Sequence, residues 1–367
     1  MRLVSLLLGL ASLVPLSAFA TNPTRAQLQI LGELYGWGQG TTGGGEQAAI
    51  YEVTTNADSG QGSLRAALES PDPLWIVFAI SDTIKLKTPI RVKSNKTVDA
   101  RGRRVVIDTI TTTYPNGPCP SKDNNHGDNV TGFVIADQTN IILLNLIFDD
   151  DFKPLHVDCE GSDAITITDS SKIWIHHCTF KRWADGAVDI LSEKKMSTDV
   201  TVSWSLFEDI FQPLLWKTKH ASFHHNICRD DGLRCPDAEK MNAQNPARVH
   251  SYNNYIKNWR NNGVMIADAS QMWDDHNMLE PDQKHDAYKL DNDGCIERNG
   301  GKNVGEVNYP SKKCTISSQF KEDSNKLSPD KSKCDDSECW KTLKTRLNEG
   351  DGDHRPAGAS LRTMPGS

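Results

Sequence analysis

The stretch Lys172-Ile-Trp-Ile-His-His-Cys-Thr-Phe180 joins a run of bulky strand-forming residues to a short turn and a further hydrophobic residue. β-Branched and aromatic side chains of this kind favour strands. Five other segments end in a similar way, and the last residues of the six lie 21 to 32 positions apart. Irregular periods of this length, built on strands, indicate a solenoid whose coils carry loops of variable size. The five segments are residues 145–148, 204–207, 225–228, 253–256 and 276–279.

Short runs rich in β-branched residues predict further strands along most of the chain. An amphipathic helical pattern is confined to residues 24–35. The fold class that follows is all-β, a right-handed parallel β-helix with variable loops. The other predicted strands are residues 75–80, 97–98, 105–107, 140–148, 164–168, 199–204 and 248–252.

A column of small polar residues runs through the repeat. Asn226, Asn254 and Asn277 stand two places before the end of their segments, and Ser205 and Cys178 take the same place in two earlier ones. Asn tolerates left-handed backbone angles, and its amide can hydrogen-bond along a stack. We therefore expect an asparagine ladder at the turns of successive coils.

The overall composition restricts the class of protein. The chain has 367 residues, 37% hydrophobic and 24% charged, which is enough to bury a core. Its formal net charge of -7 argues against a nucleic-acid binder, because such proteins depend on faces rich in Lys and Arg. No long apolar run follows the first twenty residues, which argues against a polytopic membrane protein. We expect a monomer that binds neither nucleic acid nor a membrane.

The two ends of the chain differ from its middle. Residues 1–20 read MRLVSLLLGLASLVPLSAFA, with one early Arg, a Leu-rich stretch and small residues at the end. This pattern is typical of a secretory signal peptide. Residues 321–367 hold few apolar side chains and many charges, so we expect a polar tail there. The β-helix domain is expected over residues 21–320 of a secreted, extracellular protein.

Secretion would place the cysteines in an oxidising environment where disulfides form. The chain has nine cysteines, so at least one thiol should stay unpaired in a monomer. The sequons Asn95-Lys-Thr97 and Asn129-Val-Thr131 predict a glycoprotein. The spacing leaves the disulfide connectivity open, and the candidate pairs that are close in sequence are Cys228 with Cys235, Cys295 with Cys314, and Cys334 with Cys339.

Four polar residues recur at a matching distance along the chain. Asp163 and Asp185 are 22 residues apart, as are Gln212 and Arg234. If a coil takes about 22 residues, the members of each pair lie one strand spacing apart, about 4.8 Å. One edge of the stack would then display carboxylates and, two coils later, a guanidinium.

A hard cation could bind at this edge. Asp185 and Asp189 would stand about 13 Å apart in a fully extended chain. Gly186 permits a bend that brings both toward Asp163. Three carboxylates with extra carbonyls and waters suit Ca²⁺, whereas the alternative is a solvated acidic rim. A second acidic run, residues 149–151, is more typical of a solvated turn than of a site.

Several motifs follow one another between residues 35 and 280. They are Tyr51-Glu-Val-Thr-Thr-Asn-Ala-Asp-Ser-Gly-Gln-Gly-Ser-Leu-Arg65, Ile76-Val-Phe78, Ser94-Asn-Lys-Thr-Val-Asp-Ala-Arg-Gly102, Asp163-Ala-Ile165, Trp174-Ile-His-His-Cys178, Asp185-Gly186, His224-His-Asn226, Arg234-x-Pro236 and His250-x-Tyr-Asn-Asn254. Their order and spacing resemble those of the pectate and pectin lyases of polysaccharide lyase family 1. The resemblance covers roughly residues 35–280 and implies the parallel β-helix fold.

The resemblance implies a pectate lyase that cleaves polygalacturonate, the de-esterified form of pectin, by β-elimination. In the family, carboxylates that match Asp163, Asp185 and Asp189 bind Ca²⁺. An Arg eight residues after the His-His-Asn motif removes the C5 proton, and here that position is Arg234. This proton lies alpha to the uronate carboxyl group, so a cation on that group would withdraw the developing charge. Since a free Arg keeps its proton, the role requires burial or neighbouring cations.

Three positions depart from the family pattern. Gln212 stands where the family has Lys, and Glu239 stands where it has a second Arg. Both changes remove positive charge that would hold the carboxylates of the substrate. Lys217, Arg229 and Lys240 are candidates to compensate. We expect Gln212, Glu239, Lys217 and Lys240 to contact the substrate. His176 replaces the Asp of a Trp-Ile-Asp-His motif.

Two other enzyme classes share this fold. Polygalacturonase hydrolases use paired carboxylates, for which residues 149–151, 230–231 and 274–275 are candidates. The Gly-His-Gly and Arg-Ile-Lys motifs of that family are absent, which argues against a hydrolase. A pectin lyase acting on methylated pectin would use an aromatic cleft. Trp183, Trp204 and Trp216 could line one, although buried core is their default interpretation.

A non-catalytic pectin-binding protein is the alternative outside the enzymes. The loss of positive charge at Gln212 and Glu239 motivates it. His224 and His225 do not add a metal site to any of these functions, because we expect them to stack against neighbouring coils.

Overall fold

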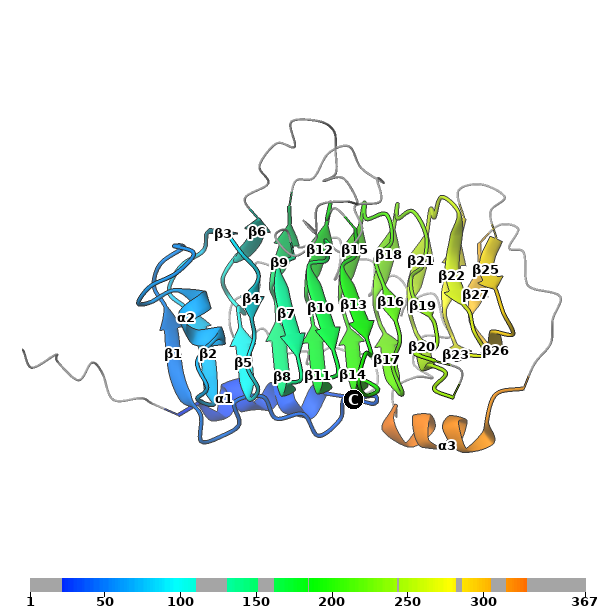
Figure 1. Ribbon diagram of the computed structural model, residues 1–367, viewed down its shortest axis with the longest axis horizontal. Coiled ribbons are helices and arrows are strands. Elements are labelled where there is room, and N and C mark those ends of the chain that lie inside the picture. Colours follow the sequence, from blue (N-terminus) through cyan, green and yellow to red (C-terminus); the bar gives the residue numbers. More distant parts are fainter. Residues whose placement is uncertain are drawn as a thin grey trace, which may run out of the picture.

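The computed structural model describes residues 22–109, 131–150, 162–183, 185–242, 244–281, 286–304 and 315–328. Successive coils of the chain stack on one another, and a full coil contributes one strand to each of three parallel sheets (Figure 1). The predicted parallel β-helix is confirmed. The expected signal peptide and most of the expected tail lie outside the described residues.

The first sheet has ten strands in the described part of the chain and includes the quoted stretch around Trp174. Every pair of neighbours is parallel, as in Ile173 opposite Val200 and Ile141. Its strands are β1 (Ala49–Val53), β2 (Leu74–Phe78), β5 (Lys96–Asp99), β8 (Thr139–Leu144), β11 (Ser171–His176), β14 (Thr198–Ser203), β17 (Ala221–His224), β20 (Arg248–Tyr252), β23 (Gln271–Asp275) and β26 (Cys295–Asn299).

The second sheet follows the turn at the end of each strand of the first. It contains nine short strands among the described residues. They are β3 (Thr83–Leu86), β6 (Val106–Thr109), β9 (Ile147–Asp149), β12 (Thr179–Lys181), β15 (Leu206–Glu208), β18 (Ile227–Arg229), β21 (Tyr255–Lys257), β24 (Met278–Glu280) and β27 (Lys302–Asn303).

The third sheet positions the candidate site. Eight of its strands are described. They are β4 (Ile90–Arg91), β7 (Phe133–Ala136), β10 (Ile165–Thr168), β13 (Val188–Leu191), β16 (Leu215–Trp216), β19 (Asp237–Ala238), β22 (Asn262–Ile266) and β25 (Asp286–Leu290).

The predicted polar ladder is present at the turn between the first and second sheets. The backbone N–H of Ser205 donates to Oδ1 of Asn226 at 2.8 Å, and that of Asn226 donates to Oδ1 of Asn254 at 2.9 Å. The N–H of Asn254 donates to Asn277 at 2.7 Å, and that of Cys178 donates to the Ser205 hydroxyl at 3.2 Å. The ladder therefore satisfies buried backbone donors at successive coils.

The sequence suggested that the ladder residues themselves adopt left-handed backbone angles. In the structure the residue before each ladder position does so instead. His177, Trp204 and His225 have φ values of 52°, 53° and 55°. Their rings stack on one another, with centroids 5.9 Å and 4.5 Å apart. This stacking favours a backbone conformation that is uncommon for bulky side chains. His224 stacks on Tyr252 at 4.6 Å, so the prediction that both histidines stack is confirmed.

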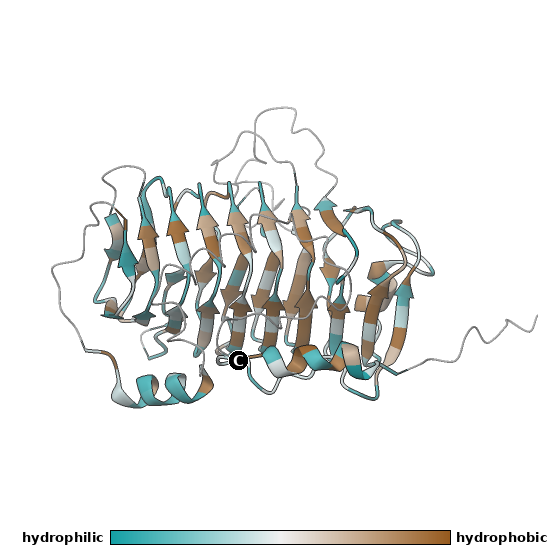
Figure 2. Ribbon diagram, turned by 180° about the vertical axis from the view of Figure 1, so that it is seen from behind, coloured by the Kyte–Doolittle hydropathy of each residue, from teal (hydrophilic) through white to brown (hydrophobic). Residues whose placement is uncertain are grey.

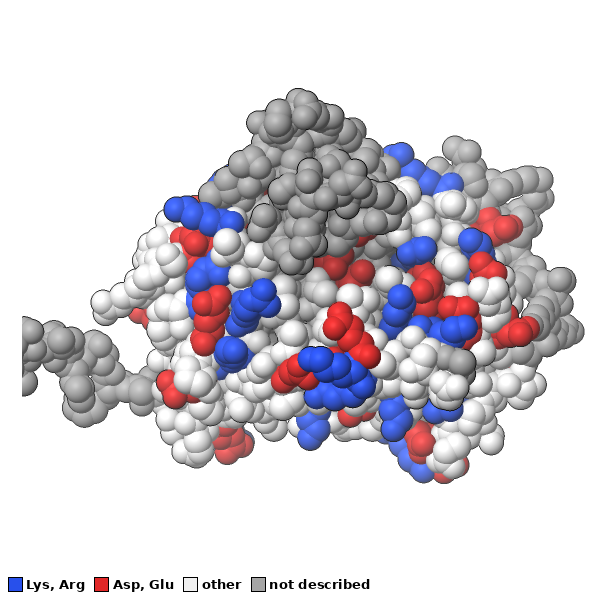
Figure 3. Space-filling view, viewed as in Figure 1, with Lys and Arg blue, Asp and Glu red and all other residues white. Residues whose placement is uncertain are grey.

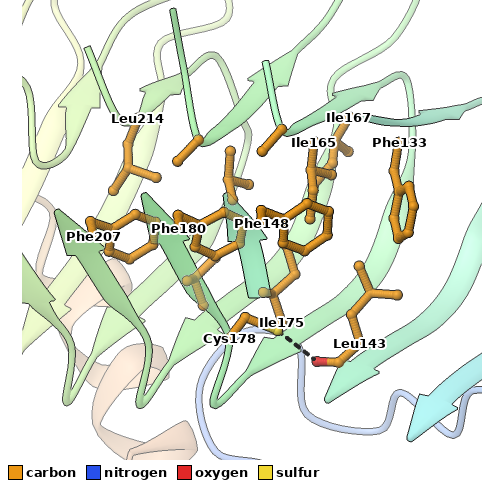
Figure 4. Packing of buried hydrophobic residues seen from close by; sticks show 14 of the residues in the cluster. Phe133, Leu143, Phe148, Ile165, Ile167, Ile175, Cys178, Phe180, Phe207 and Leu214 are labelled. Atoms are coloured by element: carbon orange, nitrogen blue, oxygen red, sulfur yellow. Dashed lines mark hydrogen bonds between the residues drawn. The ribbon is translucent and has the colours of Figure 1, made fainter. Parts of the chain in front are cut away.

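The core fills the inside of the coils (Figure 4). Phe148, Phe180 and Phe207 occupy equivalent positions of β9, β12 and β15 and stack with ring centroids 5.0 Å apart. The strands are mainly apolar (Figure 2). Trp183, Trp204 and Trp216 are buried, so their default interpretation holds and they do not line an aromatic cleft.

Segments from both ends of the described chain cover the first sheet (Figure 1). The predicted N-terminal helix is short, with α1 (Arg25–Leu28) followed by the 3₁₀ helix η1 (Gln29–Glu33) and with Thr24 as its N-cap. Helix α3 (Ser318–Leu327) crosses the boundary expected at residue 320, because Phe320 is buried against the β-helix. No described helix is long and apolar enough to cross a membrane.

The described cysteines fit the expectation of partial pairing. Cys228 and Cys235 form a disulfide, as predicted. Cys295 is also disulfide-bonded, whereas Cys334 and Cys339 lie outside the described residues. Cys178 is a free, buried thiol, and burial raises its pKa to about 12.

Replacing the central ladder residue should destabilise the fold. Asn254→Ala removes the acceptor of the Asn226 N–H and the donor to the Phe223 carbonyl, both buried. Each unsatisfied buried group costs about 1 to 3 kcal/mol, so the free energy of unfolding should fall by roughly 2 to 6 kcal/mol in denaturant titration. The control Asn56→Ala, at an exposed residue, should change it by less than about 0.5 kcal/mol. Equal effects of the two variants would contradict the ladder's role.

The docking of α3 should depend on pH. His220 stacks on Trp37 with ring centroids 4.0 Å apart, and Trp37 donates from Nε1 to Ser324 of α3. Burial, followed by the charges of Lys219 and Arg248, lowers the pKa of His220 to about 4. Because the folded state favours neutral imidazole, the stabilisation is present above about pH 6.5 and is lost as the pH falls toward about 4.

Hydrogen exchange of the α3 amides measures this effect. Protection should decrease between about pH 7 and about pH 4 after correction for intrinsic exchange rates, and His220→Phe should remove most of the decrease. Protection in the wild-type protein that does not change over this range would contradict the account.

Candidate functional site

The candidate site lies at the start of the third-sheet strands and on their outer face. Val188 and Ile190 point into the core, so alternation places Asp189 on the opposite side of β13. In spite of facing outward, Asp189 and Asp163 are both buried, with 9% and 4% of their surface exposed. Asp185 is half-buried.

The observed register corrects the predicted spacing. Ile165 of β10 lies opposite Val188 of β13, so this coil is one residue longer than the 22 residues assumed. Asp185 is therefore not opposite Asp163, and its backbone N–H donates instead to the carbonyl of Ser162 at 3.1 Å. The predicted coil length of 22 residues is correct two coils later, where Leu215 lies opposite Asp237. The extra residue lies in the connection between β10 and β11, because Ile167 and Ile175 are eight residues apart whereas their counterparts Trp216 and Phe223 are seven apart.

Gly186 lies between two bent residues, Asp185 and Ala187, at the point where Asp163 and Asp189 come together. A Cβ at this position would lie 2.6 Å from Oδ1 of Asp163 and 2.9 Å from Oδ1 of Asp189. The two carboxylate oxygens therefore flank the same point of the backbone. Glycine is required here because it leaves space, since its φ is not in the left-handed region.

Both buried carboxyl groups are poorly compensated by the protein. Burial raises the pKa of Asp163 to about 6, although the Thr166 hydroxyl, which donates to Oδ2 at 2.8 Å, and the Gly186 backbone oppose the shift. Burial and then the charges of Asp163 and Asp185 raise the pKa of Asp189 well above its usual value. The N–H of Leu215 donates to Oδ1 of Asp189 at 3.0 Å. Ionising this pair is therefore costly without a further positive charge.

These residues fit a hard cation. Oδ1 of Asp163 is buried and has no hydrogen bond of normal geometry with the described residues. A divalent ion would supply the missing partner and offset the repulsion between the carboxylates. The three aspartates do not, however, each bring a ligand atom to within 4.8 Å of the others. Among the described residues, the group that does so is Cys228, Asp231 and Cys235, whose two sulfurs are joined in a disulfide.

Arg234 stands two coils beyond Asp189. It precedes β19, in a left-handed conformation with a φ of 68°, and 24% of its side chain is exposed. The guanidinium donates from Nη1 to Oε1 of Gln212 at 2.6 Å, across the coils that the equal spacing predicted. The equal spacing in the sequence therefore predicted correctly that Gln212 and Arg234 lie next to each other. Gln212 orients the guanidinium instead of adding positive charge to the site.

Asp237 is a site residue that the sequence interpretation missed. Its carboxylate has no exposed surface, and Oδ2 lies 3.1 Å from Nε of Arg234. Burial, followed by the charge of Glu239, raises its pKa to about 8, and Arg234 and Lys217 oppose the shift. The sequence feature that could have identified Asp237 is its position three residues after Arg234. Because the next residue, Ala238, points into the core, Asp237 lies on the outer face of the strand.

The other predicted substrate contacts are held by neighbouring charges. Lys217 Nζ lies 3.7 Å from Glu239 on the next coil, and Lys240 Nζ lies 3.3 Å from Asp268. Both lysines therefore have carboxylate partners within the chain. Their contact with a substrate remains a prediction. Figure 3 shows acidic and basic side chains interspersed on one face of the molecule.

The acidic pairs considered for a hydrolase serve other contacts. Asp149 forms an ion pair with Arg182 at 2.6 Å. Asp150 is buried and bonds to Thr109, so the expectation of a solvated turn is wrong. Asp151 lies outside the described residues. Asp231, Asp274 and Asp275 are buried as well, Asp231 with the N–H of Ile210 as a donor and Asp275 in contact with His276.

The family described as "Pectate lyase" matches residues 24–328, most of the chain. The chain belongs to the pectate lyase family. The resemblance found in the motifs is thus confirmed at the level of the family.

Named relatives match part of the chain. Pectate lyase 1 of Cryptomeria japonica is 32% identical over 176 residues, which are 47% of this chain and 44% of that protein. Putative pectate lyase 17 of Arabidopsis thaliana is 35% identical over 188 residues, or 47% of this chain and 42% of the relative. The matched region thus spans less than half the length of these relatives.

Solved structures support the fold. The crystal structure of jun a 1, the major allergen from cedar pollen, has a TM-score of 0.54 at 19% identity and covers 83% of this chain and 94% of that one. The thermostable pectate lyase PL 47 has a TM-score of 0.55 at 18% identity, covering 80% and 89%. At these identities the likeness concerns the β-helix alone.

A side chain at Gly186 should disrupt the carboxylate pair. Gly186→Ala places a methyl group against both carboxylates, and overpacking of this kind costs about 1 to 3 kcal/mol. Gly32→Ala is the matched control, because a Cβ there meets nothing within 4 Å and φ is not left-handed. The control should change the free energy of unfolding by less than about 0.5 kcal/mol in chemical denaturation. A Gly186→Ala variant as stable as the control would refute the close approach.

Proposed function

We propose that this protein is a secreted pectate lyase that cleaves polygalacturonate by Ca²⁺-assisted β-elimination. One observation carries the proposal: two buried carboxylates face each other across Gly186, and the guanidinium of Arg234 follows two coils later on the same sheet. Family membership and the names of the relatives support the same chemistry.

Asp163 and Asp189 would hold the cation, with Asp185 beside them. When bound, Ca²⁺ supplies a Lewis acid for the uronate carboxylate and offsets the charge of the buried aspartates. Arg234 would take the C5 proton of the sugar. Gln212 orients it through the bond from Nη1, which leaves the guanidinium partly exposed.

The alternatives receive less support from the structure. Trp183, Trp204 and Trp216 are buried, so they do not form the aromatic surface expected of a pectin lyase. The candidate hydrolase acids are engaged with groups such as Arg182 and Thr109. A non-catalytic binding protein would not require the contact between Arg234 and Gln212.

Secretion and a monomeric state are part of the same proposal. Oxidised cysteines at Cys228, Cys235 and Cys295 agree with secretion, because disulfides persist outside the reducing cytosol. We infer a monomer that acts on cell-wall pectin, with the β-helix spanning the domain expected at residues 21–320. The tail expected from residue 321 would begin after α3 instead.

Ultraviolet absorbance of unsaturated sugar ends tests the activity. Wild-type protein with polygalacturonate and Ca²⁺ should produce this absorbance, and a chelator should abolish it. Arg234→Ala should lower kcat by about 100-fold or more, as expected for loss of a general base. Arg104→Ala, at an exposed arginine outside the site, is the matched control and should retain full activity. New reducing ends without absorbance would instead indicate a hydrolase, and binding without either signal a non-catalytic protein.

A further inference from the structure

Arg234 can accept the C5 proton only after it has lost one of its own, so the site must contain a group that removes a proton from Arg234. A guanidinium in water keeps its proton at neutral pH. Neighbouring cations would ease its loss, but Gln212 is neutral and Lys217 lies against Glu239. Arg234 can then lose its proton to an acceptor group that contacts it directly.

Asp237 is in position to be that acceptor. Its Oδ2 atom lies 3.1 Å from Nε of Arg234, within hydrogen-bonding distance. The Nε of Arg234 has no hydrogen bond of normal geometry with the described residues, so its proton is not held by another acceptor. Burial and the side-chain hydrogen bond with Glu239 disfavour the ionised form of Asp237, which raises the affinity of its carboxylate for a proton.

The surroundings of Asp237 add to this effect. Its opposite partners on the neighbouring strands are Leu215 of β16 and Met265 of β22, neither of which carries a charge. Glu239, on the same face two residues later, repels the ionised form. Arg234 and Lys217 are the cations that favour it, and Lys217 is 3.7 Å from Glu239.

We propose that Asp237 is a positioning residue that takes the Nε proton of Arg234 and so prepares the guanidine to act as the base. This inference rests on the proposed lyase function. Asp237 does not touch the substrate in this scheme and acts through Arg234.

The proton balance closes over one cycle. The Nε–H bond of Arg234 breaks and an O–H bond forms on Asp237, leaving a neutral guanidine. The guanidine takes the C5 proton, and the C–H electron pair forms the C4–C5 double bond as the C4–O bond breaks. The Asp237 proton then passes through solvent to the departing oxygen, which restores the guanidinium and the carboxylate.

Proton transfer from Arg234 to Asp237 makes the reaction rate depend on pH. Burial and the charge of Glu239 raise the pKa of Asp237 to about 8. Below this pH the carboxyl group already holds a proton and cannot take another from Arg234. The rate should therefore rise with pH to about 8 and then level off, as long as the substrate is saturating.

Two variants test the role by kinetics. Asp237→Asn keeps the size of the side chain but cannot take a proton, so kcat should fall by about 100-fold, KM should change little and the rise toward pH 8 should disappear. Asp237→Glu should recover part of kcat. The control Asp230→Asn removes a carboxylate from the connection between β18 and β19, where Asp230 accepts a hydrogen bond from Asn258. It should keep the wild-type rate and pH profile.

Carbon-13 NMR of labelled aspartate provides a readout that does not need activity. The carboxyl signal lost in Asp237→Asn should titrate near pH 8 in the wild-type protein. A carboxylate in a simple structural ion pair would titrate below its usual value of 3.8. That result, or an Asp237→Asn variant with wild-type kcat and pH profile, would overturn the proposal. A wild-type protein without lyase activity would instead refute the proposed function, and the NMR titration would still decide whether Asp237 holds the proton.

Discussion

The parallel register of the stacked coils is the constraint on which the rest of the structure depends. Each coil must place its strands opposite those of the coil before it, and the ladder through Asn226, Asn254 and Asn277 holds that register by binding buried backbone N–H groups. Stacked phenylalanines fill the inside of the same coils. Residues far apart in the chain, such as Gln212 and Arg234, come together only because this register is kept.

The candidate site combines this register with buried charge. Asp163, Asp189 and Asp237 all lie on the outer face or edge of the third sheet, and burial raises the pKa of each. Three such groups would destabilise a protein that used them for structure alone, because their ionisation is costly. A cation between the first two and a shared proton at the third would offset this cost. On the proposed function, the negative net charge of the chain is compatible with a polyanionic substrate, because a metal ion would add local positive charge beside Arg234.

The fold was largely predictable from the sequence, whereas the site was predictable only in part. Strands and the ladder are predictable from the sequence because β-branched runs and repeated turn residues are local properties of the chain. Coil length depends on turn geometry, and one extra residue was enough to move Asp185 out of line with Asp163. Asp237 escaped notice because its importance comes from burial and from contact with Arg234, neither of which a pattern of residues reveals. Gly186 was noticed for flexibility, but its role is to leave space between two carboxylates.

Calorimetric titration of the protein with Ca²⁺ tests most directly whether the buried aspartates form a cation site beside Arg234. We predict one bound ion per chain at about pH 7, with binding that weakens as the pH falls below about 6 because Asp163 becomes protonated. Asp189→Asn should remove this binding. The absence of binding in the wild-type protein, or equal binding in Asp189→Asn, would contradict the account.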